Sequence, residues 1–395
     1  MDVSFKGVCP PHKIGKVYIY PISKDLSLST ISKYCDAINP ANKLGSGCNG
    51  EVFTLGMDLV IKKAKPNALV NKSLMNEAKK LDILYNLEKE KGIKLKNIQS
   101  GIAGFEFPNG DSYLVSTLVK GSKANIEKNP FNEKNLDSLM NLLTELDKGS
   151  DKDGRLMMFD LNLNNINITE NQAGIFDFEY MIGQNLEQAI KDRIIGKLGS
   201  ASSHVSDTSN LQSNVRSFEY AGLYYYFREM PENNVKDLLT KYLKIKSKYH
   251  KKMCEYYNNL STQSNYPKEL SKIASSEQSH SKLLAKPDND IIKSEAMKIQ
   301  MANFVFVSGQ WCKTSSITFN TEQVMTYQQE GLRFFKKQLE KARQNCDKDR
   351  TIYYQNCINL FDGWKRVLTL PEIMNEGQRA RITKDKIKTL DEILL

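Results

Sequence analysis

The chain has 395 residues, of which 40% are hydrophobic and 26% charged, and its net charge is +10. These values are ordinary for a globular protein of two or three domains, each with its own core. No run of about 18 apolar residues occurs, the N-terminus lacks the apolar core of a secretory signal, and the 7 cysteines form no C-x-x-C pair. We therefore expect no membrane-spanning helix, no secretory signal and no metal-binding cysteine cluster, and free thiols in a reducing cytosol.

The charge is unevenly distributed along the chain. Residues 121–245 hold 14 basic and 18 acidic side chains, whereas residues 246–395 hold 25 and 17. A basic tail of this kind indicates an anionic partner, either a membrane surface, a soluble polyphosphate or nucleic acid. The alternative is a solvated lysine-rich surface that has no partner.

A glycine-rich stretch follows an N-terminal extension of residues 1–40. Residues 44–53 read LGSGCNGEVF, a G-x-G-x-x-G-x-V pattern. Glycines let the backbone turn tightly and bring its N–H groups against phosphate. A turn at 56–58 leads directly into a second strand, LVIKK, which predicts a phosphate-covering hairpin and not a dinucleotide-binding turn. The expected nucleotide-binding positions here are Gly45, Ser46, Gly47, Gly50 and Val52.

A lysine and a glutamate are predicted to pair. Lys62 lies in the second strand of the hairpin, and Glu77 lies in a helix predicted over 70–90. Helical periodicity puts Glu77 on the same face as three leucines, so its carboxylate points inward. A buried carboxylate needs a cation, and Lys62 is the natural partner because Lys63 faces the other side of its strand. The alternative is an exposed glutamate in a charged helix.

Three further elements lead to the next motif. Residues 111–119 are predicted to form a strand, which runs into residues 117–121. A helix predicted over 133–147 has a leucine-rich buried stripe. We expect this helix to deliver the chain to the polar stretch that follows it.

Residues 156–180, LMMFDLNLNNINITENQAGIFDFEY, hold the main cluster of polar candidates. The apolar strands LMMF and GIF lead to Asp160 and Asp177, and residues 166–168 alternate as a half-buried strand does. Asn165 follows Asp160 by five positions, so we expect the three side chains to converge at the mouth of one hairpin. Phosphoryl transfer uses such a set: one carboxylate to accept a hydroxyl proton, and an amide and a carboxylate to hold magnesium. The alternative is a polar turn without chemistry.

The glycine loop, the lysine, the helix glutamate, D-x-x-x-x-N and D-F-E occur in the same order as in the protein-kinase superfamily, which residues 44–180 resemble. The resemblance implies a bilobal fold that binds ATP with Mg²⁺ or Mn²⁺. It also implies that Asp160 is the catalytic base, that Lys62 grips the phosphates, and that Asn165 and Asp177 are the metal ligands. By the same resemblance, residues 111–119 are the last strand of the small lobe, and residues 117–121 are a hinge whose backbone would meet adenine.

Two departures from the family pattern affect function. Met158 and Phe159 stand where the usual motif has His-Arg, so no arginine is present to receive an activation-loop phosphate. Glu179 makes the metal motif D-F-E, which is familiar from the choline and aminoglycoside kinases of the same fold. A small-molecule acceptor therefore remains an alternative to a protein acceptor.

The strongest basic feature follows an aromatic helix predicted over 215–230. Residues 241–252 read KYLKIKSKYHKK, and on a helix their apolar side packs while the lysines face outward together. This arrangement is repulsive unless an anion is bound. The expected polyanion-binding residues are Lys241, Lys244, Lys248, Lys251 and Lys252, and the expected ligand is inositol hexakisphosphate.

The last part of the chain is predicted to be a basic helical module. Residues 261–290 have the composition of a linker, residues 322–346 form a basic amphipathic helix, and a further helix covers 350–367. Residues 304–311 are either a core segment or a loop that enters a lipid interface. Nucleic acid is not expected, because aromatic residues are not interleaved with basic ones. The expected lipid-binding residues are Trp311, Lys313, Arg333, Lys336, Lys337 and Trp364.

The complete prediction is an α+β protein with a β-rich kinase N-lobe, a helical C-lobe and a helical C-terminal domain. The expected boundaries are 1–40, 41–120, 121–260, 261–290 and 291–395. This order resembles the host-directed effector kinases of intracellular bacteria, Legionella-type in particular. The resemblance implies a Ser/Thr kinase secreted into the host cytoplasm, activated by inositol hexakisphosphate, bound to a phosphoinositide membrane and acting on a host protein. The alternatives are a small-molecule kinase and a nucleotide-binding pseudokinase adaptor.

Overall fold

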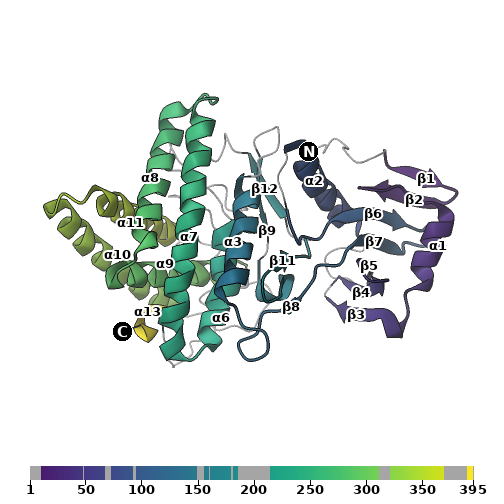
Figure 1. Ribbon diagram of the computed structural model, residues 1–395, viewed down its shortest axis with the longest axis horizontal. Coiled ribbons are helices and arrows are strands. Elements are labelled where there is room, and N and C mark those ends of the chain that lie inside the picture. Colours follow the sequence, from purple (N-terminus) through teal and green to yellow (C-terminus); the bar gives the residue numbers. More distant parts are fainter. Residues whose placement is uncertain are drawn as a thin grey trace. The chain divides into compact units, whose positions relative to one another are not determined.

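The computed structural model describes residues 10–47, 49–66, 73–91, 95–148, 155–159, 161–178, 181–185, 214–310, 321–368 and 389–394. The fold is α+β, with an antiparallel sheet in the first part of the chain and helices in the rest (Figure 1). Two compact units are present. Unit 1 comprises Met1–Lys123 and Asn165–Met181, and unit 2 comprises Ala124–Asn164 and Ile182–Leu395.

A seven-stranded antiparallel sheet forms the framework of unit 1, in the order β1-β2-β6-β7-β5-β4-β3. Its strands are β1 (His12–Ile14), β2 (Val17–Pro21), β3 (Lys43–Ser46), β4 (Gly50–Leu55), β5 (Leu59–Ala64), β6 (Gly101–Glu106) and β7 (Ser112–Thr117). The N-terminal extension thus supplies two strands of the same sheet. The predicted hairpin is β4–β5, which turns at Gly56 with a φ of 69° that glycine adopts without strain.

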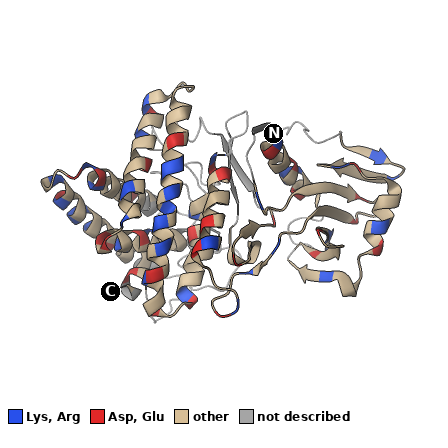
Figure 2. Cartoon of the chain, viewed as in Figure 1, with Lys and Arg blue, Asp and Glu red and all other residues tan. Residues whose placement is uncertain are grey.

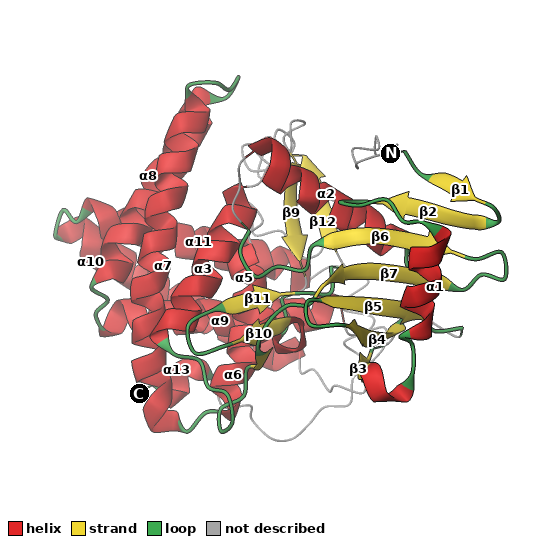
Figure 3. Ribbon diagram, turned by 45° about the vertical axis from the view of Figure 1, so that its right-hand side comes forward, coloured by secondary structure: helices red, strands yellow, loops and turns green. Residues whose placement is uncertain are grey.

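Two helices cover opposite faces of this sheet (Figure 3). Helix α1 (Leu28–Asp36) buries Ile31 in a core with β-strand residues that include Phe53 and Ile61. Helix α2 (Met75–Lys91) packs so closely on β6 that a Cβ added to Gly101 would lie 2.8 Å from the Cβ of Leu81. Side chains alternate along a strand, so Ile61 faces α1 and the next residue of β5 faces α2.

A smaller sheet completes unit 1, in the order β11-β10-β8, with β8 (Ser122–Lys123), β10 (Ile166–Ile168) and β11 (Ala173–Ile175). Ile166 and Ile168 are 0% and 1% exposed, which confirms the predicted alternation. The hairpin is β10–β11 alone. The predicted strand LMMF lies in β9 (Arg155–Phe159), which pairs with β12 (Met181–Asn185) and not with β10. The 3-10 helix η2 (Leu163–Asn165) separates β9 from β10 along the chain.

Helices make up most of unit 2. They are α3 (Glu133–Lys148), α5 (Asn214–Phe218), the π-helix η3 (Glu219–Leu223), α6 (Tyr224–Glu229), α7 (Glu232–Ser261), α8 (Pro267–Ala285), α9 (Asn289–Gln310), α10 (Thr321–Gln344), α11 (Lys348–Leu368) and α13 (Leu390–Ile393). The predicted aromatic helix is α5–η3–α6, and Phe218 and Phe227 within it are fully buried. Its aromatic residues are therefore core residues. Across the described helices, none has the length and apolar character needed to cross a membrane.

The structure corrects two expectations about the C-terminal half. The predicted linker at 261–290 contains α8, which lies beside α7 (Figure 1) and buries Leu270, Ile273 and Leu284 at helical spacing. The predicted domain boundary at 291 is not a boundary between compact units, because α9 packs with the preceding helices. Phe304 lies inside α9 with 5% exposure and belongs to the core rather than to a lipid-inserting loop.

Candidate functional site

One lysine and two carboxylates form the central feature of unit 1, which we call the Lys62 centre. The Nζ atom of Lys62 on β5 lies 2.8 Å from Oε2 of Glu77 on α2 and 3.1 Å from Oδ1 of Asp177. The side chains of Lys62 and Glu77 are 11% and 2% exposed, but that of Asp177 is 39% exposed. The predicted Lys62–Glu77 pair is therefore confirmed, and one carboxylate of the centre remains open to a ligand.

The charge of Lys62 is held by its surroundings. Burial by itself would lower the pKa of Lys62, but attraction to Glu77 and Asp177 outweighs burial and raises that pKa above its usual value. The side chain therefore stays cationic at neutral pH. A fixed cation beside a half-exposed carboxylate suits an anionic ligand that carries its own metal ion.

The two predicted metal ligands lie at the same end of the β10–β11 hairpin. Ile166 is opposite Ile175 in the register, and the carbonyl of Asn165 accepts a hydrogen bond of 3.1 Å from the N–H of Phe176. Asp177 follows directly. The described residues contain no group of three or more His, Cys, Asp or Glu side chains poised for a metal ion. A carboxylate and an amide fit Mg²⁺, which proteins often hold through one or two carboxylates together with substrate phosphates.

The predicted glycine loop lies at the β3–β4 connection. The N–H of Gly47 donates to the carbonyl of Gly50 at 2.9 Å, and Nζ of Lys65 donates to the carbonyl of Gly47 at 2.6 Å. A Cβ added to Gly50 would lie 2.8 Å from the carbonyl oxygen of Lys63, so packing requires glycine there. Around Gly45, by contrast, no atom lies within 4 Å of such a Cβ, which leaves free space over the loop.

The remaining predicted residues of the nucleotide site are placed in part. Ser46 is exposed at the end of β3, and Val52 on β4 is paired in register with Lys62. Asp160, the predicted base, lies outside the described residues, as does Glu179. The roles assigned to all these residues stay predictions.

The predicted polyanion-binding lysines lie on α7, and several have acidic or polar partners. Lys241 pairs with Asp237 at 2.7 Å, Lys248 pairs with Asp137 of α3 at 2.9 Å, and Nζ of Lys252 donates to Asn141 at 2.8 Å. Lys244 and Lys251 are exposed. The repulsion among these lysines is therefore smaller than the sequence pattern indicated, because acidic partners neutralise two of them.

The predicted lipid-binding residues are described only in part. Arg333, Lys336 and Lys337 are exposed on α10. Figure 2 shows basic residues along α7 and α10 with acidic residues among them. Trp311 and Lys313 lie outside the described residues, and the side chain of Trp364 is not described either. Lipid binding by these residues stays a prediction.

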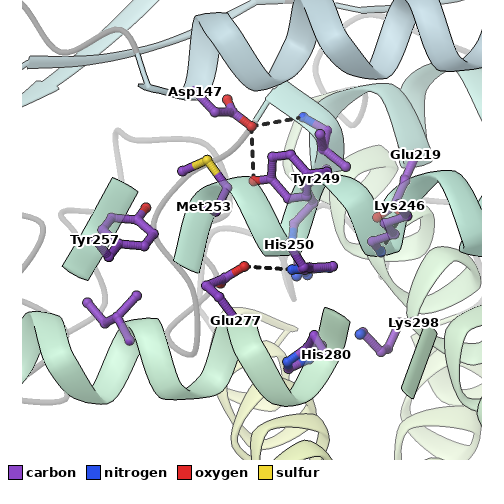
Figure 4. Close-up of a pocket in the computed structure, with 13 residues that line it drawn as sticks. Asp147, Glu219, Lys246, Tyr249, His250, Met253, Tyr257, Glu277, His280 and Lys298 are labelled. Carbon is purple, nitrogen blue, oxygen red and sulfur yellow. Dashed lines mark hydrogen bonds and ion pairs between the residues drawn. The ribbon is translucent and has the colours of Figure 1, made fainter. Parts of the chain in front are cut away.

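A second polar group, which we call the Lys246 cluster, lies deep in unit 2 beside a cavity lined by residues of α7, α8 and α9 (Figure 4). Nζ of Lys246 lies 2.5 Å from Glu219 and 2.9 Å from Glu295, and Lys298 lies 2.6 Å from Glu295. Attraction to Lys246 and Lys298 overcomes the opposing effect of burial and holds the pKa of Glu295 well below its usual value. The two lysines and two glutamates thus balance one another.

Two histidines lie at the same cavity. Nδ1 of His250 is 2.6 Å from Glu277, and the two imidazole rings of His250 and His280 are 5.0 Å apart between centroids. Burial, with help from the nearby Lys298, lowers the pKa of His280 to about 3. His280 is therefore neutral in the folded protein, and its Nδ1 donates to the carbonyl of Ser276 at 2.8 Å.

The chain matches no protein-family model and no curated protein. The solved structure of a streptomycin–ATP–APH(2″)-IIa ternary complex matches 70% of this chain and 96% of that chain, with 12% sequence identity and a TM-score of 0.29.

The structure also brings in residues that the sequence did not suggest. Gln99 accepts a hydrogen bond from the N–H of Asp177 and donates one to Ser116, and Lys65 contacts the glycine loop. No local pattern distinguishes Gln99, which lies just before β6, or Ser116, which lies within β7. Lys65 follows two other lysines in β5 and is equally inconspicuous.

Proposed function

We propose that this protein is an ATP-dependent phosphotransferase of the protein-kinase-like type. The observation that carries the proposal is the Lys62 centre, in which a lysine is fixed by a buried glutamate and a half-exposed aspartate. The hairpin with Asn165 and the hairpin with the glycine loop lie in the same compact unit. This combination of groups suits phosphoryl transfer, in which positioning and charge stabilisation supply most of the rate enhancement.

The residues of this chain have distinct tasks in the proposed reaction. Lys62 binds the α and β phosphates, and Glu77 keeps its ammonium group in place. Asn165 and Asp177 would hold Mg²⁺ or Mn²⁺, which neutralises phosphate charge when bound. The backbone of residues 45–50 covers the phosphates. Asp160, by its five-residue spacing from Asn165, accepts the proton of the attacking hydroxyl.

The proposed acceptor is a Ser or Thr hydroxyl of a protein. The competing candidate is a small-molecule hydroxyl, which Glu179 favours because D-F-E is familiar from the choline and aminoglycoside kinases. The test is to incubate the full chain with γ-labelled ATP, Mg²⁺ or Mn²⁺ and a generic protein substrate, and then to ask whether label precipitates with protein. Label found only in a soluble acceptor identifies a small-molecule kinase. Metal-dependent nucleotide binding without any transfer identifies an adaptor, and Asp177→Ala is the inactive control.

We further propose that a soluble polyanion such as inositol hexakisphosphate activates the enzyme through the exposed lysines of α7. The absence of an arginine before Asp160 supports a switch other than activation-loop phosphorylation. Titration calorimetry with the polyphosphate, combined with transfer assays, tests this proposal. Neither heat nor a change in activity would overturn it, and an intact response in the Lys241→Ala, Lys244→Ala, Lys248→Ala triple variant would move the site elsewhere.

Attachment to an anionic membrane is the last component of the proposed function, in line with an effector that acts in a host cell. Arg333, Lys336 and Lys337 lie exposed on α10, and each basic group near an anionic surface contributes about 1 kcal/mol. Sedimentation of the full chain with vesicles should therefore increase with phosphatidylinositol 4-phosphate content and decrease with salt. Equal binding to neutral and anionic vesicles would contradict this role.

A further inference from the structure

The backbone of Asp177 adopts a conformation that a side chain normally disfavours. Its φ is 64°, and among the described residues only Asn97 and Cys346 share a positive φ without being glycine. A Cβ in the left-handed region crowds the neighbouring carbonyl oxygen. Such a conformation persists where the surrounding structure holds it, so the residues that contact Asp177 decide where its carboxylate points.

Gln99 makes the contact that holds Asp177. Its side-chain Oε1 accepts a hydrogen bond of 2.8 Å from the backbone N–H of Asp177, and its Nε2 donates to Oγ of Ser116 on β7 at 2.9 Å. Gln99 is 7% exposed and Ser116 is 1% exposed. The amide therefore has both ends engaged, and a buried polar group with fixed partners has one preferred orientation.

The backbone around Gln99 fixes the strand that precedes Asp177. The N–H of Gln99 donates to the carbonyl of Ile175 at 3.0 Å, and the N–H of Ile175 donates to the carbonyl of Asn97 at 3.3 Å. Gly174 lies so close that an added Cβ would be 2.4 Å from the carbonyl oxygen of Asn97. The segment 97–99 and β11 are thus packed without a gap, and Asp177 has little freedom to turn.

The same segment reaches the predicted hinge. Oδ1 of Asn97 accepts a hydrogen bond of 3.1 Å from the N–H of Lys120, and the N–H of Thr117 donates to the carbonyl of Ser100 at 2.9 Å. Residues 97–100 therefore connect two parts of the proposed ATP site, the hinge expected to meet adenine and the aspartate expected to hold the metal ion.

We infer that Gln99 is a positioning residue that sets the Asp177 carboxylate for metal binding. The inference rests on the proposed function of the Lys62 centre. Gln99 acts through the Asp177 backbone and contacts neither substrate nor metal. Without its amide the N–H of Asp177 loses its acceptor, the left-handed conformation relaxes, and the carboxylate leaves its place beside Lys62. Residues that orient metal ligands in this indirect way typically contribute about 10- to 100-fold to metal affinity.

The test measures metal affinity separately from turnover. Wild type, Gln99→Met, Ser116→Ala and the control Gln172→Met are titrated with Mn²⁺ in the presence of a non-hydrolysable ATP analogue, and the thermal shift is followed. Gln99→Met keeps the side-chain volume and removes both hydrogen bonds. Ser116→Ala frees one end of the Gln99 amide. Gln172 is exposed in the turn of the same hairpin, so the control repeats the substitution at a site without this contact.

The half-saturating Mn²⁺ concentration should rise about 10- to 100-fold in Gln99→Met, rise less in Ser116→Ala and stay unchanged in Gln172→Met. In phosphotransfer assays kcat should fall at low metal and recover at high metal, which a merely structural role would not produce. Unchanged metal affinity in Gln99→Met would overturn the inference. If Gln99→Met fails to fold, Ser116→Ala decides, and wild-type affinity in that variant overturns it.

Failure of the proposed function is distinguishable from failure of this inference. Wild-type protein that binds metal and nucleotide but transfers no phosphate overturns the proposed function, while the Mn²⁺ titrations still decide the role of Gln99. Wild-type protein without any metal-dependent nucleotide binding overturns both.

Discussion

Two lysines of this protein each bridge a pair of carboxylates, one in each compact unit. Lys62 lies 2.8 and 3.1 Å from Glu77 and Asp177, and Lys246 lies 2.5 and 2.9 Å from Glu219 and Glu295. The chemical groups are the same, but their exposure differs. The side chain of Asp177 is 39% exposed, whereas that of Glu295 is 0% exposed and also pairs with Lys298.

This difference in exposure distinguishes the Lys62 centre, a candidate ligand site, from the Lys246 cluster, which is a buried structural network of ion pairs. In the Lys246 cluster every charge is matched by another charge of the protein, so a ligand would have to break existing ion pairs to enter. Under the proposed function, the open carboxylate of the Lys62 centre would accept a metal ion and the lysine would bind phosphate. Residue types alone do not distinguish the two; the exposure of one carboxylate does.

The largest effect is expected from Glu295→Gln in the Lys246 cluster. This substitution leaves Lys246 and Lys298 short of a counter-charge in a fully buried place, and breaking a buried pair costs about 3–5 kcal/mol. Denaturant unfolding should show this loss of stability. A variant as stable as wild type would mean that water reaches the cluster and that the contrast with the Lys62 centre is wrong.

The matched change in the Lys62 centre is Asp177→Asn. Because Asp177 is half-exposed, we expect stability to change by no more than about 1 kcal/mol. Phosphate transfer should fall by at least about 100-fold, because the substitution removes the charge proposed to hold the metal ion. Parallel unfolding and transfer assays check both values, and a large loss of stability with retained transfer would reverse the assignment.

An effect of intermediate size is expected on the free energy of unfolding when the pH is lowered. His280 has a pKa of about 3 in the folded protein, against about 6.5 when unfolded. Between these values the unfolded state binds more protons, so stability falls as pH decreases from about 6.5 towards 3, by at most about 1.4 kcal/mol per pH unit from this group. His280→Gln should have a shallower dependence over this range. An identical slope in both proteins would show that His280 does not contribute.

The smallest effect is expected on the outer face of α7. Lys248 pairs with Asp137 on a surface where the two side chains are 62% and 35% exposed. Exposed pairs contribute about 0–1 kcal/mol, so Lys248→Ala should leave the unfolding free energy nearly unchanged. A loss as large as that of Glu295→Gln would mean that the lysines of α7 are structural rather than available to an anion.

Sequence patterns predicted the parts of the site that are encoded locally. Glu77 was found through the 3.6-residue period of its helix, and Asn165 and Asp177 through their positions beside short strands. Gln99 could not be found, because its partner Asp177 is 78 positions away and a single polar residue carries no pattern. Glu295 was missed for a different reason. Charged residues are almost never fully buried unless they are paired, so a sequence gives no reason to expect a buried glutamate. The charges that pair with one another in this cluster lie on three separate segments, η3, α7 and α9, which no local pattern connects.

The same reasoning explains the errors about the C-terminal half. Polar residues are abundant in α8, and several of them, such as Ser276, Glu277 and His280, are buried beside its apolar residues. This polar composition imitated a linker and concealed the apolar residues at helical spacing. The opposite facing of Lys62 and Lys63 on β5, by contrast, was correctly predicted from the alternation of side chains along a strand. That alternation puts Lys63 on the opposite face, with its Nζ 5.8 Å from the centre of the Tyr113 ring.

Because Lys62 and Lys63 are adjacent on β5, the register of this strand decides which of the two lysines faces Glu77, in addition to its effect on stability. A slip of one residue in β5 would turn Lys62 towards Tyr113 and present Lys63 to Glu77, because side chains alternate between faces. Lys63 would carry the same charge as Lys62, but the rest of β5 would be shifted by one residue relative to the glycine loop. Gly50 packs closely on Lys62 in the observed register, since a Cβ at this position would lie 3.0 Å from Cγ of Lys62. Deletion of one residue of β5 before Lys62 would therefore move Lys63 into the position of Lys62, where it would face Glu77.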